Sequence, residues 1–305
     1  MANHPLTHHK LLNSLLLRVL ACYIRRFPFD NGKWRLIPAA LHACRDAHHI
    51  DTWREIRTRY GFRIQVDLGD WLGRHLYVTG EYESATTHVI AELLNPGGVF
   101  LDVGANLGYF SLLAATRVGP SGRVYSVEAL PLLHDRLLGN FQRNGFTQCH
   151  LLPFAVSDAE GELDFHPGPQ DHRGISSLRA RGDTSEPVRV PVKRLDDELS
   201  DAPKIDFVKI DVEGAESHAL DGMACMLERD QPPIVLEVTE SYLNDMGRSV
   251  SDIERLLSPM GYRFFRIDNE VLTPLHRLAD DGVDQFNALC TVSPLPEILA
   301  QKVVR

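Results

Sequence analysis

Short apolar runs alternate with segments of helical periodicity along most of the chain beyond residue 83. Continuous apolar runs of strand length are typical of strands that are covered on both faces. They fall at 99–103, 123–127, 150–156, 207–210, 234–238, 262–267 and 286–292, with helical segments at 83–94, 108–118, 132–144, 211–227 and 251–260. This alternation predicts an α/β fold with a doubly wound, mostly parallel sheet and helices on both faces.

The first part of the chain has a different pattern. Residues 1–60 are rich in Leu, Arg and His, lack a strand pattern and are predicted to be helical, with breaks at Pro28 and Pro38. From 62 to 79 the apolar residues alternate, which predicts strands. We therefore expect a helical N-terminal arm or cap over 1–60 and a second domain over 61–305.

Residues 160–195 interrupt the strand–helix alternation. They are rich in Gly, Pro, Asp and Arg and contain two strand-like runs, at 163–166 and 188–192. This predicts a β-hairpin insertion in the second domain. Its polar residues are candidates for hydrogen bonds to a sugar, although a solvated loop is the simpler interpretation. These residues are Asp171, His172, Arg173 and Ser176.

Composition excludes several classes of protein. The 305 residues are 44% hydrophobic and 24% charged, a globular balance that needs no disulfide or metal for a full core. The formal charge of −9 gives no long-range attraction to nucleic acid, so no nucleic-acid partner is expected. Five cysteines, an odd number without a CxxC pair, favour reduced thiols and a cytoplasmic location.

No apolar window reaches the roughly 18–20 residues that a membrane span needs. The nearest is 11–24, which Asn13, Ser14 and Arg18 interrupt. An amphipathic helix that packs on the core is the favoured interpretation, and a helix lying on a membrane surface is the alternative. The same helix is a candidate interface for a homodimer.

The segment 99–110 has the strongest chemical signal. An apolar strand runs into Asp102, and Gly104, Asn106 and Gly108 follow before a helix. In open α/β sheets, ligands bind outside the carboxyl ends of the strands, where glycines allow close approach of the backbone. The next strand ends in Glu128, 20 residues after Gly108, a spacing that suits hydrogen bonds to ribose hydroxyls.

A nicotinamide cofactor fits this loop poorly. The dinucleotide fingerprint G-x-G-x-x-G needs glycine where this chain has Asn106 and Tyr109. Side chains there and a second nearby carboxylate hinder a diphosphate. A nucleoside ligand without phosphate fits better, and S-adenosylmethionine is such a ligand, with Asp102 facing its cationic amino-acid end or a bound water.

Two long motifs together carry a family resemblance. Asp-Val-Gly-Ala-Asn-Leu-Gly at 102–108 and Lys-Ile-Asp-Val-Glu-Gly-Ala-Glu at 209–216 resemble motifs of the FkbM-family methyltransferases. Shorter stretches at 80–83, 155–158 and 195–197 are similar too. The resemblance, over roughly 62–295, implies a class I methyltransferase (Rossmann-like) fold with a seven-stranded sheet. It also implies S-adenosylmethionine-dependent methyl transfer, usually to a hydroxyl of a sugar or natural product.

The resemblance also implies roles for individual residues. Glu128 takes the ribose hydroxyls. Glu81, with Glu83, precedes a helix and closes over the cofactor, or only favours the helix dipole. The remaining cofactor residues are Asp102, Gly104, Asn106 and Gly108 along the methionine and ribose, Ser157 and Asp158 at the adenine edge, and Asp211 in the cleft.

Asp211 and Glu213 are the candidate catalytic residues. Asp211 ends a buried strand, so it points into the cleft, and an alcohol acceptor needs a group that takes its proton. The alternative is that Glu213 and Glu216 cap the following helix. His218 and His276 are weaker candidates for the base.

A metal ion is conceivable at this cleft if Asp211, Glu213 and Glu237 converge, because hard carboxylate oxygens suit magnesium or calcium. The Asp-Asn pair expected of a magnesium-dependent catechol-type site does not follow the strand at 234–238. The prediction is therefore that no metal is obligatory.

Two other functions stay open at this point. One is methylation of nitrogen or of a macromolecule such as RNA, against which the acidic balance counts. The other is a binding protein with a decayed methyltransferase fold, since fold alone does not prove activity. The small-molecule acceptor itself cannot be read from the sequence.

Overall fold

The computed structural model of the chain describes residues 18–25, 33–46, 52–167, 186–269 and 271–304. Contacts divide these residues into two compact units. Unit 1 comprises the described residues up to Tyr82, and unit 2 comprises the described residues from Glu83 onward.

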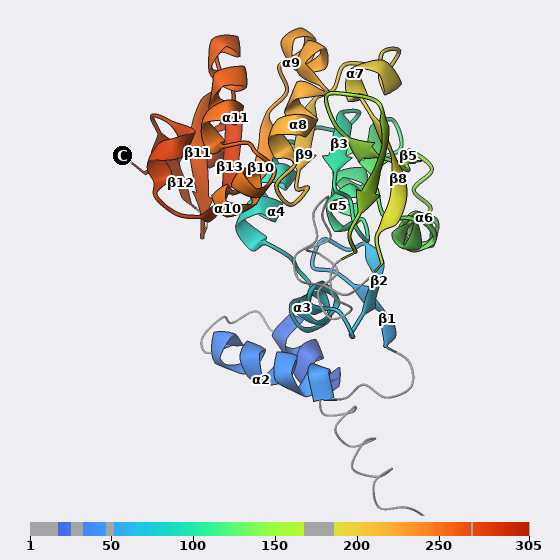
Figure 1. Ribbon diagram of the computed structural model, residues 1–305. Helices are drawn as coiled ribbons and strands as arrows, with labels where there is room; N and C mark the ends of the chain where they lie inside the picture. Colours follow the sequence, from blue (N-terminus) through green and yellow to red (C-terminus); the bar gives the residue numbers. More distant parts are fainter. Residues whose placement is uncertain (1–17, 26–32, 47–51, 168–185, 270, 305) are drawn as a thin grey trace, which may run out of the picture. The chain divides into compact units, whose positions relative to one another are not determined.

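The centre of unit 2 is an eight-stranded sheet (Figure 1). Its spatial order is β12 (Val271–Leu275), β11 (Arg263–Asp268), β13 (Gln285–Thr291), β10 (Ile234–Thr239), β9 (Phe207–Ile210), β3 (Val99–Val103), β4 (Arg123–Val127) and β5 (Cys149–Leu152). β12 and β13 run in the direction opposite to that of the other six strands, so the pairs β12–β11, β11–β13 and β13–β10 are antiparallel and the remaining pairs are parallel. Six of the seven expected strands are confirmed as single strands, and the run expected at 150–156 is divided between β5 of this sheet and β6 (Ala155–Val156) of another. The edge strand β12 adds an eighth strand that the apolar pattern did not predict.

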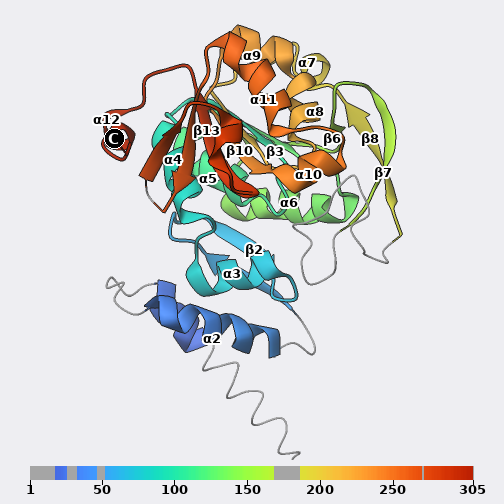
Figure 2. The same ribbon diagram turned by 60° about the vertical axis from the view of Figure 1, so that its left-hand side comes forward.

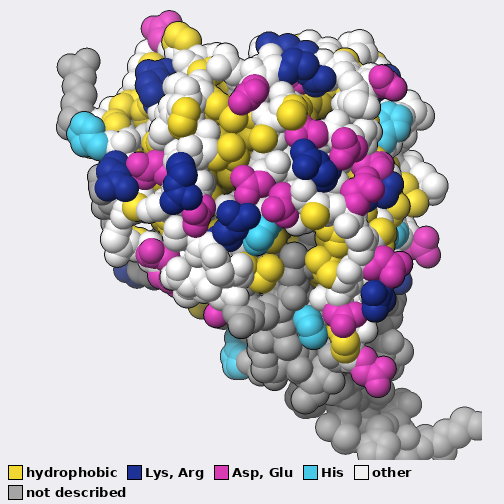
Figure 3. All heavy atoms as spheres, turned by 45° about the horizontal axis from the view of Figure 1, so that its top comes forward, with side chains coloured by type: hydrophobic (Ala, Val, Ile, Leu, Met, Phe, Trp, Pro, Cys, Tyr) yellow, Lys and Arg dark blue, Asp and Glu magenta, His cyan; other side chains and the backbone are white. Residues whose placement is uncertain are grey.

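Helices cover both faces of this sheet, as expected (Figure 2). One face carries α4 (Ser84–Leu93), α5 (Tyr109–Val118) and α6 (Pro131–Asn144), and the other carries α8 (Glu216–Asp221), α9 (Ala224–Asp230) and α11 (Val250–Leu257). Shorter elements are α7 (Leu195–Glu198), α10 (Glu240–Asp245), η2 (Ser258–Met260), η3 (Leu278–Asp281) and α12 (Glu297–Ala300). On the face of the molecule in Figure 3, Lys and Arg are interspersed with Asp and Glu, as on a solvated surface.

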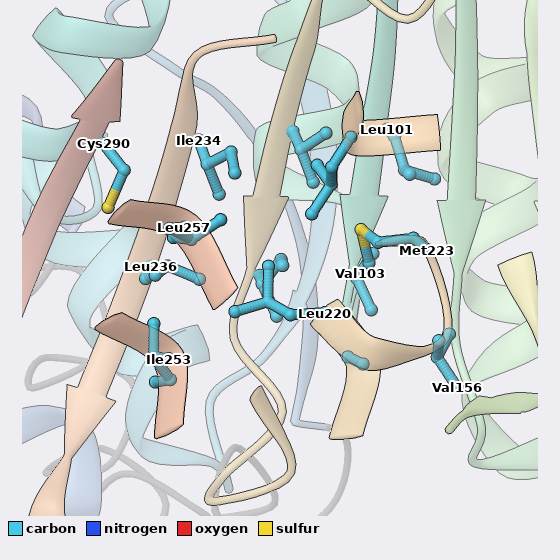
Figure 4. Close-up of a cluster of buried hydrophobic side chains, with 14 of the residues drawn as sticks. Leu101, Val103, Val156, Leu220, Met223, Ile234, Leu236, Ile253, Leu257 and Cys290 are labelled. Atoms are coloured by element: carbon cyan, nitrogen blue, oxygen red, sulfur yellow. The ribbon is translucent and has the colours of Figure 1, made fainter. Parts of the chain in front are cut away.

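The central strands are apolar because helices bury them on both faces. Every residue of β3 and β9 is buried, and Phe100 and Phe207 lie 5.7 Å apart between ring centroids. Figure 4 shows Leu220 of α8, and Met223 just after this helix, among the side chains of the strands. Such interior packing supplies most of the folding free energy of a domain of this kind.

The insertion forms a second, three-stranded sheet. Its order is β6 (Ala155–Val156), β8 (Val188–Lys193) and β7 (Gly161–Phe165). β7 and β8 pair antiparallel, which confirms the predicted hairpin. Asp171, His172, Arg173 and Ser176 lie outside the described residues, so their proposed contact with a sugar stays a prediction.

Unit 1 combines helices with a hairpin, which corrects two predictions. It contains a helical stretch at 18–25, then α2 (Lys33–Asp46), β1 (Trp53–Arg57), β2 (Arg63–Asp67) and α3 (Trp71–Thr79). β1 lies inside the segment predicted to be helical, and it pairs antiparallel with β2. Residues 71–79 were predicted as strand and are helix.

The sequence signals of α3 explain that second error. Asp70 caps its first turn by accepting a hydrogen bond from the Gly73 amide at 3.3 Å, and Gly80 ends it at φ 71°. Leu76 and Val78 look like alternation, but Leu72 and Leu76 are buried four residues apart, which is helical spacing.

The membrane predictions concern the window 11–24, of which 11–17 lies outside the described residues. Among the described residues, no helix is both long enough and apolar enough to cross a membrane.

We predict that Leu220→Ala lowers the free energy of unfolding by about 2–5 kcal/mol, because the fully buried side chain leaves a cavity in the core. Leu132→Ala is the control, since Leu132 is 49% exposed on α6, and about 0.5 kcal/mol or less is expected there. Guanidinium unfolding followed by circular dichroism measures both. Equal losses for the two variants would contradict the assigned core.

Candidate active site

The turn after β3 packs directly against the end of β9. A Cβ atom added at Gly104 would lie 1.8 Å from the carbonyl oxygen of Asp211, and Gly104 has a φ of 88°. No other residue type fits such an approach without moving the backbone. The amides of Gly104 and Ala105 donate to the carbonyl oxygen of Val127 at 3.0 and 2.9 Å. The turn therefore joins the ends of three neighbouring strands.

Glu128 is held at the end of β4 by two backbone amides. Its Oε2 accepts from the Asn106 amide at 2.7 Å and its Oε1 from the Leu130 amide at 2.8 Å. Asn106 has a φ of 52°, a left-handed value that Asn tolerates better than most residues. Burial raises the pKa of Glu128 to about 7, although both amides favour its charged form. A carboxylate fixed in this way still has lone pairs for ribose hydroxyls.

Asp102 places one unpartnered carboxylate oxygen at the same edge of the sheet. Its side chain is 1% exposed, and Oδ2 accepts from the Ser111 hydroxyl at 2.5 Å. Oδ1 has no hydrogen-bond partner within the part of the chain that the structure describes. Burial raises the pKa of Asp102, and the ammonium of Lys209 opposes this. A cationic amino group or a water bound to one would satisfy the oxygen.

A buried ion pair joins β9 to the site. The ammonium of Lys209 lies 2.9 Å from Oδ2 of Asp211 and 4.5 Å from the centroid of the Phe110 ring. Burial alone would lower the pKa of Lys209, but the neighbouring carboxylates, Asp211 first, raise it overall. Lys209 is therefore a charged side chain in a buried position.

Glu237 on β10 hydrogen-bonds to the carboxylate of Asp211. The charge of Asp211 together with burial raises the pKa of Glu237. Burial pushes the pKa of Asp211 upward, but the nearby Lys209 ammonium and the hydrogen bond from Glu237 leave it lowered. The pair therefore holds one proton at neutral pH, on Glu237, and Asp211 stays ionised.

Glu213 completes a group of three converging carboxyl groups. One oxygen from each of Asp211, Glu213 and Glu237 lies within 4.8 Å of the others, which is the convergence considered from the sequence. Glu213 has a φ of 54°, a left-handed conformation that is strained for this residue type. The turn after β9 thus directs a carboxylate toward its neighbours.

A polar cavity of about 540 Å³ opens beside this group. Glu237 pairs in register with Asn287 of β13, whose Nδ2 donates to Oε2 of Glu83 at 3.3 Å. Nε2 of Gln285 donates to Oε1 of Glu237 at 2.6 Å. The lining residues are Glu83, Glu237, Arg266, Ile267, Asp268, Val283, Gln285, Phe286 and Asn287. Amide and carboxylate groups around a cavity suit a hydroxylated ligand.

Four other predicted cofactor residues make local contacts. Glu81 lies in unit 1, where its carboxylate accepts from the Tyr60 hydroxyl at 3.3 Å and pairs with Arg59 at 3.6 Å. The Ser157 hydroxyl donates to Asp158 at 2.9 Å, just after β6. Gly108 begins α5, and a Cβ atom there would meet the side chain of Leu137 at 2.4 Å.

The weaker catalytic candidates lie elsewhere or have structural contacts. Oε1 of Glu216 accepts from the amides of Val212 and Gly214 at 3.2 and 3.1 Å, so this residue braces the turn after β9. His218 faces Asp158 at 3.6 Å. His276 is exposed.

Sequence reasoning missed the roles of several polar groups. Lys209 and Glu237 stand inside otherwise apolar strands, and a charged residue in such a run was the available signal for a buried pair. Gln285 and Asn287 had no such signal. Their contribution follows from the pairing of β13 with β10, which no local pattern indicates.

An acidic residue placed for ribose, a glycine turn beside it and carboxyl groups at the next strands are what the sequence led us to expect of an S-adenosylmethionine-dependent methyltransferase. S-adenosylmethionine is the methyl donor of this class. The family model described as the methyltransferase FkbM domain matches residues 102–264. The chain belongs to the FkbM-domain methyltransferase family.

Curated relatives include proteins named methyltransferases and a synthetase of which the chain spans a small part. The AMB antimetabolite synthetase AmbE of Pseudomonas aeruginosa is 25% identical over 83% of this chain. The matched part is 13% of the length of AmbE. The hexuronic acid methyltransferase AglP of Haloferax volcanii is 28% identical over 55% of the chain and 67% of AglP. The 31-O-demethyl-FK506 methyltransferase FkbM of Streptomyces tacrolimicus is 28% identical over 61% of the chain and 81% of that protein.

Among solved structures, methyltransferase FkbM from Methylobacillus flagellatus is 16% identical with a TM-score of 0.40, over 84% of this chain and 59% of that one. M. jannaschii TYW2 in complex with AdoMet is 13% identical with a TM-score of 0.44, and the match covers 80% of this chain and 86% of that one.

We predict that S-adenosylhomocysteine binds more tightly as pH rises from 6 to 8. Ribose hydroxyls donate to the ionised form of Glu128, and a pKa of about 7 leaves this form scarce at pH 6. The expected gain in affinity is roughly five- to tenfold. Isothermal titration calorimetry measures it.

Glu128→Gln serves as the control for that titration, because it keeps one acceptor oxygen but cannot ionise. Binding to this variant should be weaker and should lose the pH dependence. An unchanged pH dependence in Glu128→Gln would refute the assignment, and would place the titrating group elsewhere, with the buried Glu216 as the next candidate.

Proposed function

We propose that the chain transfers the methyl group of S-adenosylmethionine to a hydroxyl oxygen of a small sugar or natural product. The observation that carries the proposal is the pair formed by Asp211 and Glu237, which adjoins a polar cavity. Relatives support this acceptor class: AglP is named a hexuronic acid methyltransferase, NoeI of Sinorhizobium fredii a 2-O-methyltransferase, and FkbM a 31-O-demethyl-FK506 methyltransferase.

The cofactor site of this proposal lies at the ends of β3 and β4. The turn at Gly104, Asn106 and Gly108 takes the methionine and ribose, and Glu128 accepts the ribose hydroxyls. The unpartnered oxygen of Asp102 faces the amino-acid end. Ser157 and Asp158 reading the adenine edge, and Glu81 closing over the cofactor, rest on the family resemblance.

Asp211 is the base in this mechanism. The acceptor hydroxyl donates a hydrogen bond to the ionised carboxylate, which takes the proton as the oxygen attacks the methyl carbon. The new O–CH₃ bond forms as the C–S⁺ bond breaks, and its electron pair stays on sulfur as a neutral thioether. Proximity and alignment of donor and acceptor supply much of the rate.

The neighbours of Asp211 set its protonation and orientation. Lys209 keeps the carboxylate ionised, and Glu237 fixes it through a hydrogen bond. Glu213 lies close enough to Asp211 to accept a hydrogen bond from the acceptor hydroxyl or to receive the proton that this hydroxyl loses. Glu83, Gln285 and Asn287 line the cavity and present acceptors and donors to other hydroxyls of the ligand.

This mechanism has no obligatory metal. The ammonium of Lys209 already neutralises Asp211 at 2.9 Å, and the proton held by Glu237 removes a second negative charge from the group. A divalent cation would have to compete with both. The paired charges support acid–base chemistry carried out by the side chains.

Asp211→Asn should lower kcat/KM by about 100-fold or more, because the amide cannot take the hydroxyl proton. Glu240→Gln is the control, an exposed residue of α10 that should leave turnover unchanged. The assay follows S-adenosylhomocysteine release with a panel of hydroxylated acceptors, and calorimetry checks cofactor affinity. Full activity in Asp211→Asn would rule out this base.

Removal of metal ions with EDTA should leave the turnover rate within about twofold of that of untreated protein, because Lys209 supplies the local positive charge. The same acceptor assay measures it before and after addition of magnesium or calcium. Activity that EDTA abolishes and magnesium restores would show that the three carboxyl groups bind a required ion.

A further inference from the structure

The two parts of the chain differ in charge. Residues 1–82 contain 12 Lys and Arg and 7 Asp and Glu, a formal charge of +5. The whole chain carries −9, so residues 83–305 carry −14. A basic segment attached to an acidic one indicates an anionic ligand for the basic segment. The family model begins at residue 102, so it assigns nothing to this part of the chain.

A cavity of about 490 Å³ lies within unit 1. Three of its lining residues are arginines, namely Arg25 of the helical stretch at 18–25, Arg57 at the end of β1, and Arg59 just after it. Among the lining residues that the structure describes, Glu55 is the acidic one, and its carboxylate pairs with Arg63 at 3.8 Å. The described part of the lining therefore has an excess of positive charge.

All three guanidinium groups are held by the backbone in the same way. The Nε atoms of Arg25, Arg57 and Arg59 each donate to a main-chain carbonyl oxygen. The acceptors are, in that order, Ala21 at 3.2 Å, Gly61 at 3.1 Å and Thr79 at 3.3 Å. Such bonds restrain the side chain and leave the terminal Nη groups to face a ligand, which lowers the entropy lost on binding.

Contacts around Gly80 bring two of the arginines together. A Cβ atom added at Gly80 would meet Cδ of Arg25 at 3.0 Å and Cγ of Arg59 at 3.7 Å. Arg25 also lies over the ring of Tyr77, 5.4 Å from its centroid. Arg59 pairs with Glu81 at 3.6 Å, a contact that an incoming anion would share.

The Nη groups of Arg25 and Arg57 donate no hydrogen bond to any residue that the structure describes. Arg25, Arg57 and Arg59 line the same cavity, and like charges in one cavity repel unless an anion lies between them. Guanidinium groups bind phosphate oxygens through paired hydrogen bonds. We propose that the arginine-lined cavity of unit 1 binds a phosphoryl anion, carried by a soluble phosphate ester or by a lipid headgroup. The proposal does not rest on the methyl transfer proposed for unit 2, although Glu81, the partner of Arg59, is also one of the predicted cofactor residues.

Inorganic pyrophosphate and lipid vesicles are the two probes. Calorimetry with the full chain measures pyrophosphate binding, and sedimentation measures binding to phosphatidylcholine vesicles with and without phosphatidylglycerol. Arg57→Ala and Arg25→Ala should each weaken binding about tenfold, because each removes charge-assisted hydrogen bonds. Arg35→Ala is the matched control, an exposed arginine of α2 that lines no part of the cavity.

Circular dichroism and thermal unfolding establish that each variant is folded. Arg57→Lys is a second variant, which keeps the positive charge but loses the paired N–H donors of the guanidinium group. Pyrophosphate binding without vesicle binding supports a soluble phosphate ester, and arginine-dependent binding of the anionic vesicles supports a lipid headgroup. Binding of neither probe overturns the proposal. So does an equal loss in Arg35→Ala, which would show diffuse charge instead of a site.

Discussion

The buried ammonium of Lys209 is the interaction on which the site depends. Asp102, Asp211 and Glu237 lie in one low-dielectric region, where several unpaired carboxylates would cost far more than folding can supply. Lys209 contacts Asp211 at 2.9 Å and opposes the rise in the pKa of Asp102. The remaining excess charge is removed by a proton on Glu237. One cation and one proton thus allow several carboxyl groups to lie close together inside an apolar sheet.

Backbone geometry positions this group beside the proposed cofactor site. The turn at Gly104 has room for no side chain against the carbonyl of Asp211, so the ends of β3 and β9 are held in contact. The same turn leads to Asn106, whose amide anchors Glu128. A single loop therefore positions both the proposed cofactor site and the proposed base, as an in-line transfer would need.

The sheet was predictable from sequence because its strands are buried on both faces and its helices end at clear signals. The hairpin at β1 and the helix α3 were not, since short segments such as 53–57 and 71–79 carry ambiguous patterns that tertiary contacts decide. Spacing predicted that the glycine turn and Glu128 lie together, as the bond between the Asn106 amide and Glu128 shows, and their role in cofactor binding stays a prediction. The proton-sharing pair and Asn287 were not, because they depend on which strands lie next to each other.

A crystal structure of the chain with S-adenosylhomocysteine tests the central claim most directly. The account predicts ribose hydroxyls within hydrogen-bond distance of Glu128, the amino group near Oδ1 of Asp102, and the sulfur facing the cavity beside Asp211. Density for the ligand at another edge of the sheet, with Glu128 still bonded only to the Asn106 and Leu130 amides, would contradict it.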